Sequence, residues 1–200
     1  MVLWVKVSLH EHELGVTWLE RGGAFRTGNA LVADERVWLI DPFDHPESIA
    51  AATGRGTPAG VVQLLDRHSR DCAAIASRLG VPHLRLPANS AGTPFTPVRV
   101  VWKPRWREVA LWWHDERALV VPEAIGTLPV FALGRRAGVH PVLRLLPPRG
   151  PLAPFSPERL FVGHGDAITS DADAALREAL AHSRRDLPKL VAQAPKLLRR

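Results

Sequence analysis

The chain has 200 residues, of which 46% are hydrophobic and 23% are charged. A chain of this length is expected to form one domain with a substantial buried core. Its single cysteine, Cys72, excludes an intrachain disulfide and a metal site built from cysteines alone. The sequence contains no long apolar run, so we expect no signal peptide and no association with a membrane, and we predict a cytoplasmic protein.

The positive charge of the chain is concentrated near its C-terminus. The net charge is +6, yet residues 184–200 alone contain six basic residues and one acid, Asp186. These basic residues are Arg184, Arg185, Lys189, Lys196, Arg199 and Arg200. We therefore predict a single domain over residues 1–183 and a basic tail over residues 184–200. A tail of this charge indicates a polyanionic partner such as a nucleic acid.

The first third of the chain alternates between apolar runs and turn signals. Two apolar runs within Asn29–Asp41 flank Asp34-Glu35-Arg36, which is typical of a β-hairpin. The proline at position 42 ends the second run, because it has no N–H for a strand ladder. Around this hairpin we expect a strand at Leu3–Leu9, a polar turn at Glu11–Glu13, a strand at Gly15–Leu19 and a short helix from Pro46.

The middle of the chain has the order strand, loop, helix, strand. Val61–Leu65 is apolar except for Gln63, as expected for a strand that is buried on both faces. A polar loop, Asp66–Asp71, precedes helical spacing over Cys72–Leu79, and Gly80 suits the helix end. A short strand at Val81–Leu84 follows. This order predicts a parallel strand pair in an α/β layered structure.

The last half contains a second hairpin, at Val109–Val121, with the same Asp-Glu-Arg turn and a Pro-Glu ending. We expect an irregular connection over Gly134–Gly150 and a strand at Leu160–Val162, which leads into His164. The pattern after Ser170 predicts a helix with one apolar face. The tail is expected to form an amphipathic helix that is interrupted at Pro188 and Pro195.

Four segments in this order resemble landmarks of the metallo-β-lactamase superfamily. They are Asn29–Asp41, Leu64–Asp71, Ala118–Glu123 and Leu160–Gly165. In the family these are an early hairpin that ends in an acid, a His/Asp loop after a strand, a strand that ends in Gly-Asp, and a strand that ends in Gly-His. The resemblance implies a four-layer αββα sandwich with one or two metals at one edge. Such metals lower the pKa of a bridging water, which produces hydroxide near neutral pH.

The loop motif of the family, His-x-His-x-Asp-His, is altered in this chain. When His68 is placed on the second histidine, Asp66 takes the first, Arg70 takes the aspartate and Asp71 takes the last histidine. A guanidinium cannot coordinate a cation. The middle histidine of the family has no counterpart in residues 101–108, and Glu123 stands for the bridging aspartate.

A second register places Asp71 on the motif aspartate. Arg67, Ser69 and Cys72 then stand where the family has histidines. We prefer the first register because it retains three possible ligands, Asp66, His68 and Asp71. In both registers an arginine occupies a ligand position.

The resemblance implies a hydrolase with one divalent metal, Zn, Mn or Fe, which acts on a small-molecule ester, thioester, lactone or phosphoester. The expected ligands are His68, Asp71, Glu123 and His164, with Asp66 and Asp71 as catalytic carboxylates. The alternative is a metal-free binding or scaffold protein in which Arg70 pairs with Asp71 or Glu123. Nucleic-acid association through the basic tail is compatible with either hypothesis.

Several further residues have competing interpretations. Asp41 is expected to be a turn acid, and Cys72 a buried structural thiol rather than a nucleophile. Four tryptophans lie among basic residues around the second hairpin and either stack on a planar ligand or belong to the core. They are Trp102, Trp106, Trp112 and Trp113.

Overall fold

The computed structural model describes residues 6–23, 25–68, 70–90 and 92–197, with side chains up to residue 192. The strands are β1 (Lys6–His12), β2 (Gly15–Arg21), β3 (Thr27–Ala33), β4 (Arg36–Ile40), β5 (Thr57–Gln63), β6 (His83–Arg85), β7 (Thr96–Lys103), β8 (Trp106–Trp113), β9 (Ala118–Val121), β10 (Ile125–Gly126), β11 (Gly138–Val139) and β12 (Arg159–Val162). The helices are α1 (Pro46–Thr53), α2 (Cys72–Leu79), α3 (Pro129–Ala132), η1 (Pro141–Leu143), α4 (Arg149–Leu152), α5 (Ala172–His182) and α6 (Leu187–Leu197).

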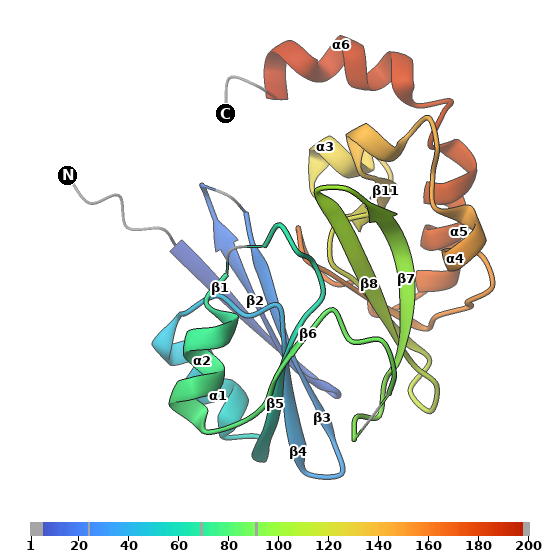
Figure 1. Cartoon of the computed structure of the whole chain (residues 1–200). Helices are drawn as coiled ribbons and strands as arrows, with labels where there is room; N and C mark the ends of the chain where they lie inside the picture. Colours follow the sequence, from blue (N-terminus) through green and yellow to red (C-terminus); the bar gives the residue numbers. More distant parts are fainter. Residues whose placement is uncertain (1–5, 24, 69, 91, 198–200) are drawn as a thin grey trace.

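Two sheets face each other, and helices cover their outer faces (Figure 1). The first sheet has the order β1-β2-β3-β4-β5-β6 and carries α1 and α2. The second sheet has the order β12-β9-β8-β7 and carries α4 and α5. Separate clusters of buried side chains fill the space between the sheets and the space beneath each helical layer. The predicted αββα sandwich is therefore confirmed.

Local signals explain where the first helices begin and end. The His45 ring accepts a hydrogen bond from the Ser48 backbone N–H at the start of α1, and Pro46 occupies its first turn. Helix α2 has the predicted bounds and ends at Gly80, whose φ of +66° is readily adopted by glycine. The parallel strands β5 and β6 on either side of α2 were also predicted.

Other elements differ from the sequence prediction. His10 and His12 lie in β1 rather than in a turn, because the turn to β2 is confined to the two residues before Gly15. Part of the strand expected at Leu3–Leu9 falls on residues 1–5, which lie outside the described residues. The connection over 134–150 contains the short elements β11 and η1 and the start of α4.

The second sheet has an edge strand, β7, that was not predicted from the sequence. Proline is tolerated on an edge strand, because its missing N–H faces away from the ladder. Pro97 is such a residue, paired with Leu111 of β8. At the C-terminus, α6 runs as one helix through Pro195, and Pro188 lies in its first turn, where an N–H is not needed.

The strand ends that carry the polar loops meet at one edge of the sandwich. Strand β4 is parallel to β5, and β9 is parallel to β12, so their carboxyl ends point in common directions within each sheet. Thr27 of β3 joins the two sheets at this edge. Its backbone N–H donates to Gly163 O at 2.9 Å, and its hydroxyl donates to Gly165 O at 2.8 Å.

Among the described residues, no helix combines the length and the apolar character that a membrane crossing requires.

We expect Gly163→Ala to lower the free energy of unfolding by about 1–3 kcal/mol, because it overpacks this edge. A Cβ at this position would lie 2.1 Å from the carbonyl oxygen of Pro122. Urea denaturation measures the change. Gly150→Ala is the matched control, since nothing lies within 4 Å of a Cβ there. Equal losses in the two variants would contradict the steric argument.

Candidate metal centre

Three side chains converge where β5, β9 and β12 end. His68 follows β5, Glu123 follows β9 and His164 follows β12, and one ligand atom from each lies within 4.8 Å of the others. His68 Nε2 is 3.2 Å from Glu123 Oε2, and His164 Nε2 is 4.0 Å from the same oxygen. Two imidazoles and one carboxylate thus face a common point.

Asp41 supports His68 from behind. It follows β4 with a φ of +43°, and its Oδ1 accepts a hydrogen bond from Leu64 N at 3.0 Å. Its Oδ2 lies 3.5 Å from His68 Nδ1. This backbone conformation is uncommon for a residue other than glycine, although Asp and Asn tolerate it best. Asp41 is therefore a buried supporting carboxylate as well as a turn acid.

Glu123 has further partners on its other oxygen. Arg67 Nη2 donates to Oε1 at 3.1 Å, and His140 Nε2 lies 3.3 Å from the same atom. The His140 Nδ1 accepts from Val142 N, so its neutral ring carries the proton on Nε2 and donates it to Glu123. Burial alone would raise the pKa of Glu123, but His140 and His68 outweigh burial and hold it below its usual range.

Glu108 fixes the turn that carries Glu123. Its fully buried carboxylate accepts from Ala124 N at 2.7 Å, from Glu123 N at 3.1 Å and from Trp106 Nε1 at 2.9 Å. Burial raises the pKa of Glu108 to about 7, even though these three donors favour the ionised form. The backbone of the Glu123 turn is thus anchored to a strand of the second sheet.

Arg70 binds backbone carbonyls rather than a carboxylate. Its Nη1 donates to Thr27 O at 2.5 Å and to Asp41 O at 2.6 Å, and its Nη2 donates to Gly163 O at 3.1 Å. The guanidinium therefore links the loops that follow β4 and β12 to the start of β3. The predicted pairing with Asp71 or Glu123 is not the arrangement found.

The two histidines differ in their affinity for a proton. Burial and Arg70 disfavour a charged His68, but the carboxylates of Asp41 and Glu123 outweigh them and raise its pKa. Burial, aided by Arg70, lowers the pKa of His164 to about 4. Near neutral pH, His164 is therefore a neutral ring, while His68 retains a proton more readily than a free imidazole.

This donor set fits a single divalent cation. Both ring nitrogens of His68 are buried and have no well-formed hydrogen bond within the described part of the chain. Catalytic zinc sites use sets of two histidines and one glutamate, and iron sites use two histidines and one carboxylate. A carboxylate behind a ligating histidine is the usual support for such a ring. A cation here would displace the His68 proton that the two carboxylates favour.

The other expected site residues lie elsewhere. Asp66 accepts a hydrogen bond from Arg107 N, and Asp71 accepts one from Asp44 N, so both carboxylates serve loop backbones. Neither His140 nor Glu108 was predicted from the sequence as a site residue. Their side chains reach Glu123 from a distant loop and from a neighbouring strand, and no local spacing signals either contact.

Cys72 is a structural thiol, and the four tryptophans around the second hairpin differ in their exposure. Cys72 is buried, and its burial raises the pKa of the thiol far above the usual range, which disfavours a nucleophile. Trp106 and Trp113 are buried, while Trp102 is about half exposed. Trp112 lies on the face of β8 opposite to Trp113, as strand alternation requires.

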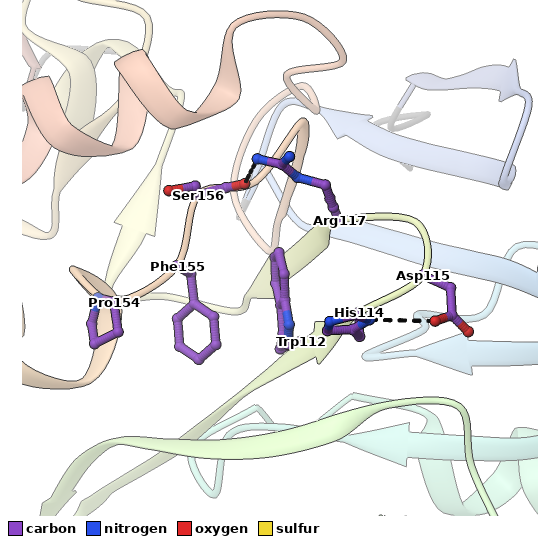
Figure 2. Close-up of a pocket in the computed structure, with 7 residues that line it drawn as sticks. All are labelled: Trp112, His114, Asp115, Arg117, Pro154, Phe155 and Ser156. Carbon is purple, nitrogen blue, oxygen red and sulfur yellow. Dashed lines mark hydrogen bonds and ion pairs between the residues drawn. The ribbon is translucent and has the colours of Figure 1, made fainter.

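Trp112 lines an open pocket of about 790 Å³ together with Phe155 and Arg117 (Figure 2). The Arg117 guanidinium donates to Ser156 O at 2.8 Å in the pocket wall. This pocket adjoins the Trp113–Ala118 end of the β8–β9 hairpin, whereas Glu123 follows the other end of β9. The pocket is therefore separate from the candidate metal centre.

The four layers and the polar cluster at one strand edge define the metallo-β-lactamase fold, which this chain adopts. A metallo-β-lactamase from Erythrobacter litoralis matches with a TM-score of 0.62 and 13% identity, over 90% of this chain and 92% of that one. A metallo-β-lactamase from Pontibacter korlensis matches with a TM-score of 0.59 and 12% identity, over 90% and 99% of the respective chains. No protein-family model matches the sequence, and no curated protein matches it either. The likeness thus lies in the fold.

Proposed function

We propose that the protein is a hydrolase that uses one divalent cation, Zn, Mn or Fe, held by His68, Glu123 and His164. The observation that carries this proposal is the convergence of these three partly buried side chains, in which His68 Nε2 faces Glu123 without a well-formed hydrogen bond. Structures that share this fold are metallo-β-lactamases. The proposed substrates are small molecules with an ester, thioester, lactone or phosphoester bond.

Asp41, Glu108 and His140 position the side chains that would hold the cation. The Asp41 carboxylate, 3.5 Å from His68 Nδ1, would favour a proton on Nδ1 when a cation binds and so leave Nε2 for coordination. Glu108 holds the backbone of the Glu123 turn, and the N–H of His140 orients the Glu123 carboxylate. A bound cation would supply Lewis acidity and acidify water at this edge. Asp66 and Asp71 serve loop backbones, so we do not assign them the catalytic roles that the sequence suggested.

Elemental analysis of protein that was expressed with zinc, manganese and iron, and then desalted, tests the proposal. We expect about one metal per chain, as in a three-ligand catalytic site. The double variant His68→Ala/His164→Ala should lose that metal and any hydrolytic activity. The variant His10→Ala/His114→Ala is the control, because both of these rings are more than half exposed. Unchanged metal content in the first variant would refute the assignment.

A metal-free binding protein is the competing proposal. It is favoured by the partners that Glu123 already has, since Arg67 and His140 both contact Oε1. The negative charge of Glu123 would then be balanced by Arg67, without a metal cation. Protein that binds no metal under the conditions above, yet retains its fold, would support this alternative and exclude the hydrolase.

A further inference from the structure

The most exposed large aliphatic side chains lie in two neighbouring segments. Val142, Leu145 and Leu146 are 73%, 63% and 68% exposed, and Val191 of α6 is 73% exposed. The other exposed large hydrophobic residues that the structure describes are Leu9, Phe25 and Trp102, which lie between 38% and 48%. Isolated exposed aliphatic residues are ordinary, but a concentration of this kind marks an interaction surface.

Buried contacts hold the backbone that carries Val142, Leu145 and Leu146 in place. Leu143 lies between them in sequence and is buried. The buried Arg144 guanidinium donates to Phe131 O and to Ser183 O, which fixes the segment against α3 and the end of α5. Leu145 O accepts from Arg184 Nε at 2.8 Å. The exposure of Val142, Leu145 and Leu146 is therefore a property of a well-anchored backbone.

Three exposed cations lie in the chain after helix α5. They are Arg184, Arg185 and Lys189, and Arg184 contacts the exposed aliphatic segment through Leu145 O. Asp186, the only acid in residues 184–200, is buried and pairs with Arg135 at 2.8 Å and with Lys189 at 3.4 Å. Its carboxylate thus offsets part of the charge of Lys189, while Arg184 and Arg185 are exposed cations.

Helix α6 also combines apolar residues on one face with basic residues. Leu187, Leu190 and Val191 follow the i, i+3, i+4 spacing of one helix face. Figure 1 shows α6 at the outer margin of the molecule, beyond α3 and α5. A helix with an apolar face and basic residues beside it is typical of segments that lie in a membrane interface.

We propose that this aliphatic–basic surface binds an anionic lipid bilayer. It consists of Val142, Leu145, Leu146 and Val191 with Arg184, Arg185 and Lys189. Exposed aliphatic groups gain free energy in the acyl region, and the cations are attracted to anionic headgroups. Single-stranded nucleic acids, in contrast, are bound by aromatic stacking together with cations, and this surface contains no aromatic residue. This contact needs no membrane-spanning segment and does not depend on the proposed hydrolase function.

Co-flotation of the full chain with vesicles tests the proposal, with phosphatidylcholine vesicles compared with vesicles that also contain phosphatidylserine. We expect binding only to the anionic vesicles and weaker binding at high salt. Arg184→Gln/Arg185→Gln/Lys189→Gln should lower the partition coefficient by roughly 100-fold, at about 1 kcal/mol for each cation. Val142→Ser/Leu145→Ser/Leu146→Ser should lower it by about tenfold or more, because apolar burial is lost.

Arg85→Gln/Lys103→Gln/Arg107→Gln is the matched control, since it removes three exposed cations elsewhere and should leave binding unchanged. Thermal unfolding checks that every variant folds. Absence of binding to anionic vesicles would overturn the proposal. So would a result in which an oligonucleotide binds instead, loses affinity in the glutamine variant and is unaffected by the serine variant.

Discussion

Arg70→Ala is expected to lower the free energy of unfolding by roughly 3–5 kcal/mol, which is the largest loss for any single exchange that we propose. The guanidinium satisfies the backbone carbonyls of Thr27, Asp41 and Gly163 at one edge of the sandwich. Alanine removes this donor from all three carbonyls, of which Gly163 O still accepts from Thr27 N, and it leaves a cavity between three loops. The cost of each unsatisfied buried acceptor adds to the cost of the lost packing.

Urea denaturation measures this loss, and two variants make it interpretable. Arg85→Ala removes an exposed arginine and should change stability by no more than about 0.5 kcal/mol. Arg70→Lys keeps the positive charge but loses the forked geometry, so it should recover only part of the loss. Because Arg70 joins the loops without a metal, the wild-type protein should stay folded in a chelator. A loss below about 1 kcal/mol for Arg70→Ala would mean that water replaces the guanidinium.

The fold was predictable from the sequence because its main signals are local. Apolar runs with turn residues located the β3–β4 and β8–β9 hairpins, and helical spacing with Gly80 located α2. The edge strand β7 was not predicted. Its hydrogen bonds come from β8, its ladder shifts register between Arg99 and Val101, and Pro97 interrupts the strand pattern. Such an edge strand is defined by its partner more than by its own sequence.

The candidate site was predictable where a residue lies in the loop that follows a strand. Glu123 and His164 come just after β9 and β12, and His68 lies further along the loop after β5, so the sheet edge brings these loops together. Asp71 lies in the same loop as His68, yet its carboxylate turns to Asp44 N, because residue spacing does not set side-chain direction within a loop. His140 reaches Glu123 through tertiary packing alone. Metal binding by these residues stays a prediction.

Asp41→Asn is expected to weaken metal binding by about 10–100-fold, the usual cost of losing the support behind a histidine ligand. The carboxylate Oδ2 lies 3.5 Å from His68 Nδ1, while Oδ1 accepts from Leu64 N. His68 and Arg70 outweigh burial and hold the pKa of Asp41 below its usual range, so the native group is an ionised acceptor. Asparagine suits the φ of +43° and can keep the Leu64 bond, so stability should change much less than metal affinity.

Competition titration against a chromogenic chelator measures the affinity. Nitrogen chemical shifts of His68, recorded without metal at a pH above its raised pKa, report the tautomer of the neutral ring. In the wild-type protein the carboxylate favours a proton on Nδ1 and keeps Nε2 directed at Glu123. The variant should show a mixture of tautomers, because an amide offers either a donor or an acceptor. Asp115→Asn is the control, since that carboxylate is 88% exposed in the distant hairpin turn. Wild-type affinity with wild-type tautomer in Asp41→Asn would show that the fold around His68 orients the ring without this carboxylate.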